Sequence, residues 1–138
     1  MCLYGHDLDT TTTPIEGALN WAISPARRTG GERAGGFVGA DIILPQMPAN
    51  ISRKRVGLKP LGKAPVREGT EIVDADNNPI GQVTSGGFSP TLSQPIAMGY
   101  VNKQNAKPGT TVYALVRGKQ LEIEVSSPVF VQNNFYRL

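Results

Sequence analysis

The sequence predicts a mainly β protein in which a six-stranded antiparallel barrel or jelly-roll-like domain follows a short helical segment. From residue 51 onward, apolar and polar residues alternate with period two, as they do in strands with one buried face. The chain also has 16 Gly and 11 Pro in 138 residues, which favours many tight turns over long helices. We therefore expect an incomplete helical part at 1–50 and the β domain at 51–138.

The first part of the chain carries helix signals. Residues 13–16 read Thr-Pro-Ile-Glu, which offers a hydroxyl N-cap, a proline at the first helical position and a Glu that completes a capping box. Apolar residues then recur at three- and four-residue spacing, so we expect a helix at 15–24. A Gly- and Arg-rich loop should occupy 25–36. One or two helical turns are expected at 37–44, before Pro45 stops them.

The next strands follow from alternation and turn chemistry. Residues 53–59 and 71–74 read as the first two strands. The run Asp-Asn-Asn-Pro at 76–79 is a turn signal, and it returns the chain into a third strand at 80–85. The second and third strands should therefore form a hairpin.

The stretch 83–101 is the most constrained part of the sequence. It reads as short strands around 82–85 and 96–101, joined by a loop rich in Gly, Ser and Pro. Gly86 and Gly87 permit backbone angles that are closed to other residues. The pattern leaves open whether this loop is an ordinary connection or a shaped part of a site.

The end of the chain predicts one more hairpin. After a Lys-Pro-Gly turn at 107–109, alternating residues indicate strands at 112–117 and 120–125, with one buried and one solvated face. A last short strand is expected at 130–131.

Composition limits the chemistry. Cys2 is the only cysteine, which excludes an intrachain disulfide and a thiolate zinc site and indicates a reducing compartment. His6 is the only histidine, and its place in a turn argues against a Ser–His–acid triad. No apolar run reaches membrane-spanning length. We therefore predict no metal site and no membrane segment.

The net charge is +3, with basic residues gathered in two stretches. They could form a solvated face, a protein-docking surface or a phosphate-contacting groove. These residues are Arg27, Arg28, Arg33, Arg53, Lys54, Arg55, Lys59, Lys63 and Arg67.

Several motifs, taken together and in order, resemble the C-terminal part of the aminomethyltransferases, the T-proteins of the glycine cleavage system. The motifs are CLYGHDLD, TTPIEGALNWAIS, GFVGADIIL, RVGL, APVREGTEI, IGQVTSGGFSPTL, PIAMGYV, KPGTTVYALVRGK and PVFVQNNFY. The combination of TSGGFSPTL with PIAMGY, at the right distance from CLYGHDLD and LNW, is the specific feature.

The resemblance implies a fragment of a longer, three-domain enzyme built around tetrahydrofolate. Such enzymes take the aminomethyl group from the lipoylated H-protein, release ammonia and form methylenetetrahydrofolate. The family's catalytic aspartate lies in the N-terminal two thirds, so no catalytic residue is expected here and the fragment should be inactive alone. Trp21 matches a tryptophan near the folate, although it could instead pack against the chain's own core. Phe135 aligns with a folate-contacting tyrosine but lacks its hydroxyl, which Tyr136 could supply by a shifted path.

Other readings stay open at this point. The module could belong to a related folate-dependent demethylase or dehydrogenase, or it could be a small basic barrel that binds nucleic acid through Arg53, Lys54 and Arg55, although those strands lack the aromatic residues needed for stacking. No nucleic acid is expected if the resemblance holds, and the basic surface around Arg53 and Arg55 would then receive an acidic H-protein. Two copies of the chain could also pair through the first part. The bacterial cytoplasm is the expected compartment, with the mitochondrial matrix as the alternative.

Overall fold

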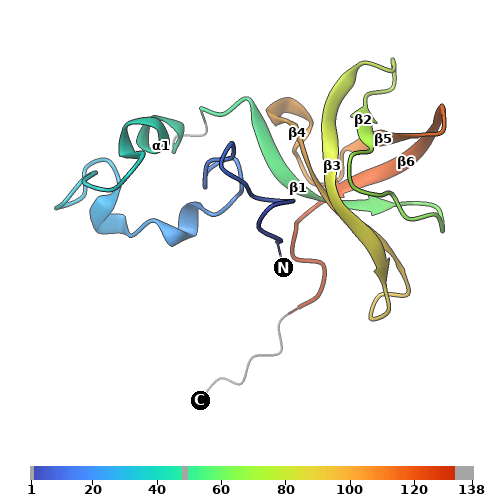
Figure 1. Ribbon diagram of the computed structural model, residues 1–138, viewed down its shortest axis with the longest axis horizontal. Helices are drawn as coiled ribbons and strands as arrows, with labels where there is room; N and C mark the ends of the chain where they lie inside the picture. The colour runs from blue at the N-terminus through green and yellow to red at the C-terminus, as the bar shows by residue number, and fades with distance from the viewer. Residues whose placement is uncertain (1, 48–49, 133–138) are drawn as a thin grey trace.

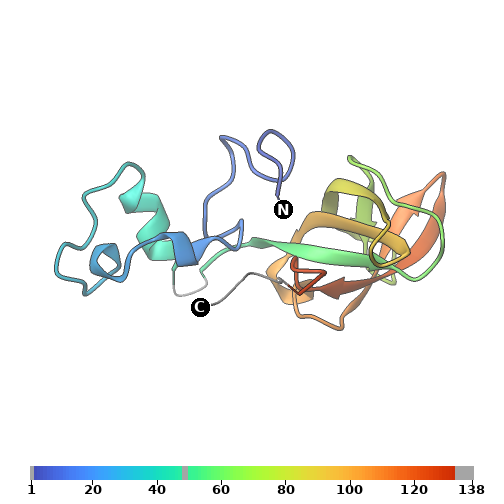
Figure 2. The same ribbon diagram turned by 90° about the horizontal axis from the view of Figure 1, so that it is seen from below.

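The computed structural model describes residues 2–47 and 50–132. Figure 1 shows an elongated molecule with a β-barrel at one end and the helical turns of the N-terminal part at the other. The start of the chain, in dark blue, lies between these two ends. Strand β1 leads from the N-terminal part into the barrel, and the same arrangement is visible from below in Figure 2.

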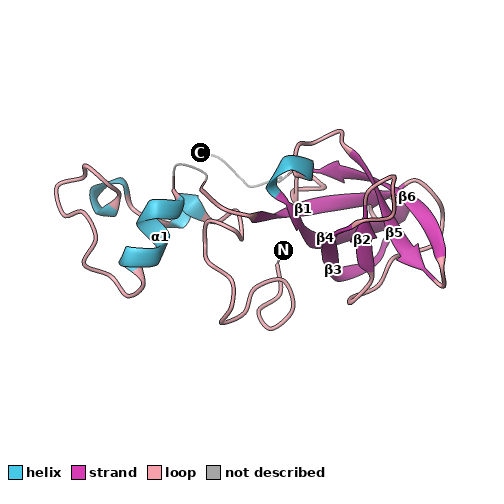
Figure 3. Ribbon diagram, turned by 90° about the horizontal axis from the view of Figure 1, so that it is seen from above, coloured by secondary structure: helices cyan, strands magenta, loops and turns pink. Residues whose placement is uncertain are grey.

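The predicted antiparallel barrel is confirmed, and its sheet is fully closed (Figure 3). Around the barrel the strand order is β1-β4-β3-β2-β5-β6, and β6 pairs back onto β1. Every pairing is antiparallel. The strands are β1 (Arg53–Pro60), β2 (Glu71–Val73), β3 (Pro79–Ser89), β4 (Gln94–Asn102), β5 (Thr111–Val116) and β6 (Lys119–Ser126).

The barrel interior is filled by apolar side chains from alternate strand positions. The predicted alternation of the last hairpin is confirmed, because Val112, Ala114, Ile123 and Val125 are fully buried. Closing the sheet pairs each of the six strands with two neighbouring strands. The core consists of Val56, Leu58, Val66, Ile72, Ile80, Val83, Ala97, Val101, Ala106, Val112, Ala114, Ile123 and Val125.

The expected Gly- and Pro-rich loop is wrong, because strand pairing continues through it. Gly86 pairs with Ala97, and the ladder runs on to the end of β3, so that only residues 90–93 form the turn. Neither Gly86 nor Gly87 has the positive φ that the sequence suggested. Gly86 is needed for another reason: a Cβ there would collide with the backbone carbonyl oxygen of Val66.

The expected helix at 15–24 is also wrong, although its capping box forms. The Thr13 N–H donates to Glu16 Oε2 at 3.0 Å, and the Glu16 N–H donates to Thr13 Oγ1 at 3.2 Å. The turn stops at Ala18, whose φ is 56°. A continuing helix would need the carbonyls of Glu16 and Gly17, but β1 takes both, through the backbone N–H and the Nε of Arg55.

Three short helices occupy the rest of the N-terminal part. They are the 3₁₀ turns η1 (Asn20–Ala22) and η2 (Pro25–Arg27) and the α-helix α1 (Ala40–Gln46). The predicted helical turns at 37–44 are thus confirmed in position, but Pro45 lies inside α1 instead of ending it.

Two further observations complete the fold. The strand expected at 130–131 is wrong, because residues 127–132 follow β6 without strand pairing. A 3₁₀ turn, η3 (Lys103–Asn105), connects β4 toward β5. Across residues 2–47 and 50–132, no helix has the length and apolar character that crossing a membrane requires.

Candidate functional site

Asp7 fastens the start of the chain to the barrel. Its carboxylate is fully buried and accepts hydrogen bonds from the Leu3 N–H at 2.8 Å, from the Ser85 hydroxyl at 2.8 Å and from the Thr84 hydroxyl. The Tyr100 hydroxyl donates to the Asp7 backbone carbonyl at 2.8 Å. A buried carboxylate is tolerated when it is fully hydrogen-bonded, so Asp7 acts as a structural anchor between residues 3–8 and the barrel.

A second connection joins β1 to the capping box. Arg53 Nε donates to Glu16 Oε1 at 3.1 Å, and its guanidinium lies 5.0 Å from the centre of the Tyr100 ring. Arg55 is only 5% exposed, and its Nε donates to the Gly17 carbonyl at 2.9 Å. Arg55 is therefore not part of an exposed basic surface, whereas the Arg53 side chain, which bonds Glu16, is still 39% exposed.

Tyr100 lies between the two connections, and its ionisation responds to that position. Burial raises the pKa of the Tyr100 phenol above its usual value, because the charged form would lose its hydration. A hydrogen bond with Thr12 and the nearby charges of Arg55 and Arg53 oppose this shift. The phenol therefore stays protonated at neutral pH and remains a donor to Asp7.

A largely apolar groove of about 550 Å³ opens where the N-terminal part, β1, β4 and the segment after β6 meet. Trp21 forms one wall and is 74% exposed, so it does not pack into the chain's own core. Arg55 is the only charged residue in the lining. The lining residues are Cys2, Ala18, Leu19, Trp21, Arg55, Ile96, Met98, Pro128, Val129, Phe130 and Val131.

The histidine and the carboxylates do not gather into a metal-binding cluster in the part of the chain that the structure describes. His6 Nδ1 lies 2.8 Å from Glu68 Oε1 at an exposed position, as a surface contact. Within residues 2–47 and 50–132, no group of three or more His, Cys, Asp or Glu side chains could hold a metal ion.

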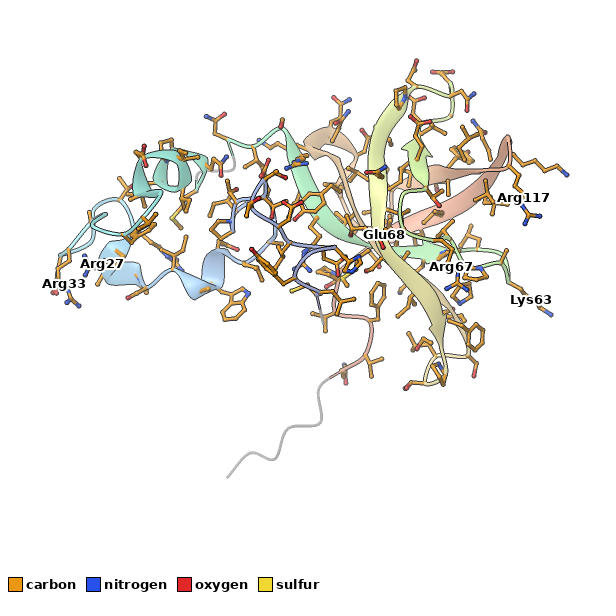
Figure 4. All side chains as sticks on the ribbon, in the orientation of Figure 1. Arg27, Arg33, Lys63, Arg67, Glu68 and Arg117 are labelled. Atoms are coloured by element: carbon orange, nitrogen blue, oxygen red, sulfur yellow. The ribbon has the colours of Figure 1, made fainter. Side chains whose placement is uncertain are left out.

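The basic residues do not gather on one surface. Figure 4 shows Arg27 and Arg33 at the tip of the N-terminal part and Lys63, Arg67 and Arg117 at the opposite end of the barrel. Arg27 also hydrogen-bonds the Gly35 carbonyl at 3.1 Å, within its own loop. Arg27 and Arg33 therefore lie far from Lys63 and Arg67, and these four residues form no common phosphate-contacting groove.

Comparison with known proteins identifies the fold's family. Residues 53–132 match the model of the glycine cleavage T-protein C-terminal barrel domain. This range contains all six strands. The chain belongs to this family.

Relatives extend the T-protein similarity over the N-terminal part as well. The mitochondrial aminomethyltransferase of Pisum sativum is 47% identical over 137 residues, and that of Homo sapiens is 44% identical over 138 residues. The chain spans about a third of these relatives' length, 32% and 33% respectively. The crystal structure of the glycine cleavage system aminomethyltransferase T from Bartonella henselae matches 99% of the chain and 37% of its own, with a TM-score of 0.91 and 40% identity.

The structure places the three residues that the T-protein resemblance singled out as follows. Trp21 lies on the groove. Phe135 and Tyr136 lie outside the described residues, and residues 128–131, which precede them, line the same groove. Sequence reasoning missed the roles of Asp7 and Arg55. Asp7 carried no local signal, whereas the apolar neighbours that follow Arg55 in β1 could have indicated a buried position.

Proposed function

We propose that this chain is the C-terminal part of an aminomethyltransferase of the glycine cleavage system. In this proposal the whole enzyme transfers a one-carbon unit from the aminomethylated lipoyl group of the H-protein to tetrahydrofolate and releases ammonia. The observation that carries the proposal is the similarity to aminomethyltransferases over 99% of the chain, which includes both sides of the groove.

We further propose that residues 1–50 belong with the folate-binding body and residues 51–138 with the barrel. Exposed apolar side chains support this division. Val38 and Ile42 are 99% and 58% exposed, and no residue of α1 is buried. A surface of this kind is suited to be covered by a further folded part of the enzyme.

The groove suits one portion of tetrahydrofolate. Trp21 offers a flat wall for an aromatic ring, and the apolar lining removes such a ring from water. Tetrahydrofolate, when bound, supplies the nitrogen that accepts the one-carbon unit. Trp21, Phe135 and Tyr136 are the residues proposed to contact it, while the chain's own contribution is to bind, orient and exclude water.

No catalytic residue is proposed within this chain. Asp7 and Glu16 are the carboxylates with the least exposure among the described residues, and both are engaged in structural hydrogen bonds. The proposed catalytic carboxylate therefore belongs to the remaining two thirds of the enzyme. Relatives named as mitochondrial support the mitochondrial matrix as a compartment, alongside the bacterial cytoplasm.

The test is complementation. The N-terminal two thirds of a relative is produced separately and mixed with this chain, and ammonia release from aminomethylated H-protein is measured in the presence of tetrahydrofolate. We expect activity from the mixture and none from either part. Ammonia release by this chain alone would contradict the proposal, as would an inactive mixture whose two parts form a complex of the expected mass.

A further inference from the structure

Three lysines surround a second groove, which we call the lysine groove. Lys54, Lys103 and Lys107 line it, and its volume of about 400 Å³ lies within the range for small-molecule sites. Among the described residues, Ala18 alone also borders the groove beside Trp21. The lysine groove is therefore a separate site, and the proposed function gives it no role.

The fold brings these lysines together from separate elements. Lys54 lies on β1, and Lys103 lies in η3, where its N–H donates to the Ser52 carbonyl at 2.9 Å. Lys107 begins the turn that leads into β5, and its carbonyl accepts a hydrogen bond from the Thr110 N–H at 3.1 Å. Backbone hydrogen bonds and strand pairing therefore fix the positions from which the three side chains extend.

The lining of the lysine groove does not balance its positive charge. No aspartate or glutamate among the described residues lines it. Lys54 and Lys107 are exposed, and neither belongs to an ion pair found within residues 2–47 and 50–132. Because like charges around one groove repel one another, an anion that enters it meets attraction from the lysines and no repulsion from the lining.

The rest of the lining is largely aliphatic. Ile15, Met47, Ile51 and Ala106 contribute to it, and a ligand that covers them removes apolar surface from water. No aromatic side chain of the described ranges lines the lysine groove, so neither a nucleobase nor another flat ring finds a stacking partner there. The lining therefore favours a ligand with an aliphatic body and an anionic end.

We propose that the lysine groove binds a small aliphatic carboxylate, with the carbon chain on the apolar lining and the carboxylate on Lys54 and Lys107. The lysine ammonium group is a compact charge on a flexible stem, so it can follow the carboxylate while staying hydrated. Pairing at an exposed rim avoids the desolvation cost of a buried ion pair. This inference does not depend on the proposed function, and an inactive mixture in the complementation test would leave it unchanged.

The experiment uses methionine methyl groups as reporters, because Met47 lines the lysine groove and Met98 lines the groove beside Trp21. Hexanoate and hexanamide, which share a carbon chain and differ in charge, are titrated into the chain labelled with ¹³C at its methionine methyl groups. We expect both probes to shift the Met47 resonance. Hexanoate should bind about three- to tenfold more tightly at low salt, the factor that one or two exposed ion pairs supply. No shift at Met47, a shift only at Met98, or equal affinities would overturn the proposal.

Two double variants assign the preference for hexanoate to the groove. Lys54→Gln combined with Lys107→Gln should bind the two probes equally. Lys63→Gln combined with Lys119→Gln removes the same net charge from exposed lysines outside the lining, and it should keep the preference. Figure 4 shows Lys63 at the far end of the barrel. A preference lost equally in both double variants would reflect the charge of the whole chain and would contradict the proposal.

Discussion

The barrel and the N-terminal part are stabilised in different ways. The barrel closes a six-stranded sheet around a continuous apolar core. Within residues 2–47, by contrast, Ile15 is the only buried apolar side chain, while Trp21 and Val38 are largely exposed. The N-terminal part is held to the barrel chiefly by hydrogen bonds to Asp7, Glu16 and Gly17.

Because of this difference, the stability of the chain and the formation of the groove depend on different parts of the molecule. Burial of apolar surface is the main source of folding free energy, so the barrel should carry most of the chain's stability. The groove, however, needs both parts, since Trp21 comes from one and Met98 from the other. Changes in the barrel core should unfold the chain, whereas changes at the connections should open the groove and leave the barrel folded.

The largest effect is expected in the barrel core. Leu58→Ala should lower the free energy of unfolding by about 2–5 kcal/mol, because Leu58 is fully buried and the substitution leaves a cavity. Ile42→Ala, in the exposed face of α1, is the matched control and should change it by less than about 0.5 kcal/mol. Urea unfolding followed by circular dichroism measures both. A large effect at Ile42 would mean that the N-terminal part shares the barrel's core.

The next effect is expected at the Asp7 anchor. Asp7→Asn removes a charged acceptor and places the N–H donors of the new amide against existing donors. We therefore expect the free energy of unfolding to fall by about 1.5–3 kcal/mol. Hydrogen exchange should accelerate in residues 3–8 but not in β5 and β6. Asp9→Asn, at an exposed carboxylate that bonds Thr11 nearby, should have a smaller and purely local effect. Uniform acceleration across the barrel would show that Asp7 belongs to one cooperative unit with it.

A pair of adjacent glycines tests the β3–β4 hairpin. Gly86→Ala should lower the free energy of unfolding by about 1–3 kcal/mol, because a Cβ there meets the Val66 carbonyl. Gly87→Ala should be neutral or stabilising by up to about 1 kcal/mol, because nothing lies within 4 Å of its added Cβ and its backbone angles are open to other residues. Thermal unfolding of the two variants compares them directly. Equal losses would favour a requirement for special backbone angles at both positions.

The smallest effect is expected from pH, through Tyr100. The folded chain holds the phenolic proton to higher pH than the unfolded chain, because burial raises the pKa of Tyr100. Stability from this group is therefore complete below the usual tyrosine pKa of about 10 and falls as pH rises beyond it. Unfolding measured from about pH 9 to 11 should show this decline, and Tyr100→Phe should reduce the slope. An unchanged slope in that variant would assign the decline to other groups.

How much of the molecule could be predicted depended on whether the determinants were local. Alternation placed the hairpin of β5 and β6 correctly, and turn chemistry placed the one between β2 and β3, because both signals lie within a few residues. The capping box also formed as expected. The helix does not continue from it, because Arg55, more than 30 residues away, donates to the Gly17 carbonyl that the helix would need. The loop expected at Gly86 became strand because β4 pairs with it.

The residues of the candidate site also differ in how far the sequence could predict them. Trp21 was found through the motif that contains it, and Phe135 and Tyr136 stay predictions. Arg55 was assigned to an exposed basic surface, since three consecutive basic residues favour a solvated strand. Its burial follows from docking of the capping box, and the apolar residues that follow it in β1 are the local pattern that could have indicated it.

By itself, the sequence determined the strand pattern, the turns, the capping box and the family, because each is written in neighbouring residues or in their order along the chain. Only the tertiary structure decided that the sheet closes, that the helix stops after one turn, and that Asp7 and Arg55 are buried. These features depend on contacts between residues far apart in the chain, because a carbonyl or carboxylate can accept a hydrogen bond from either a local or a distant donor. The groove beside Trp21 forms because the distant donors bind these acceptors.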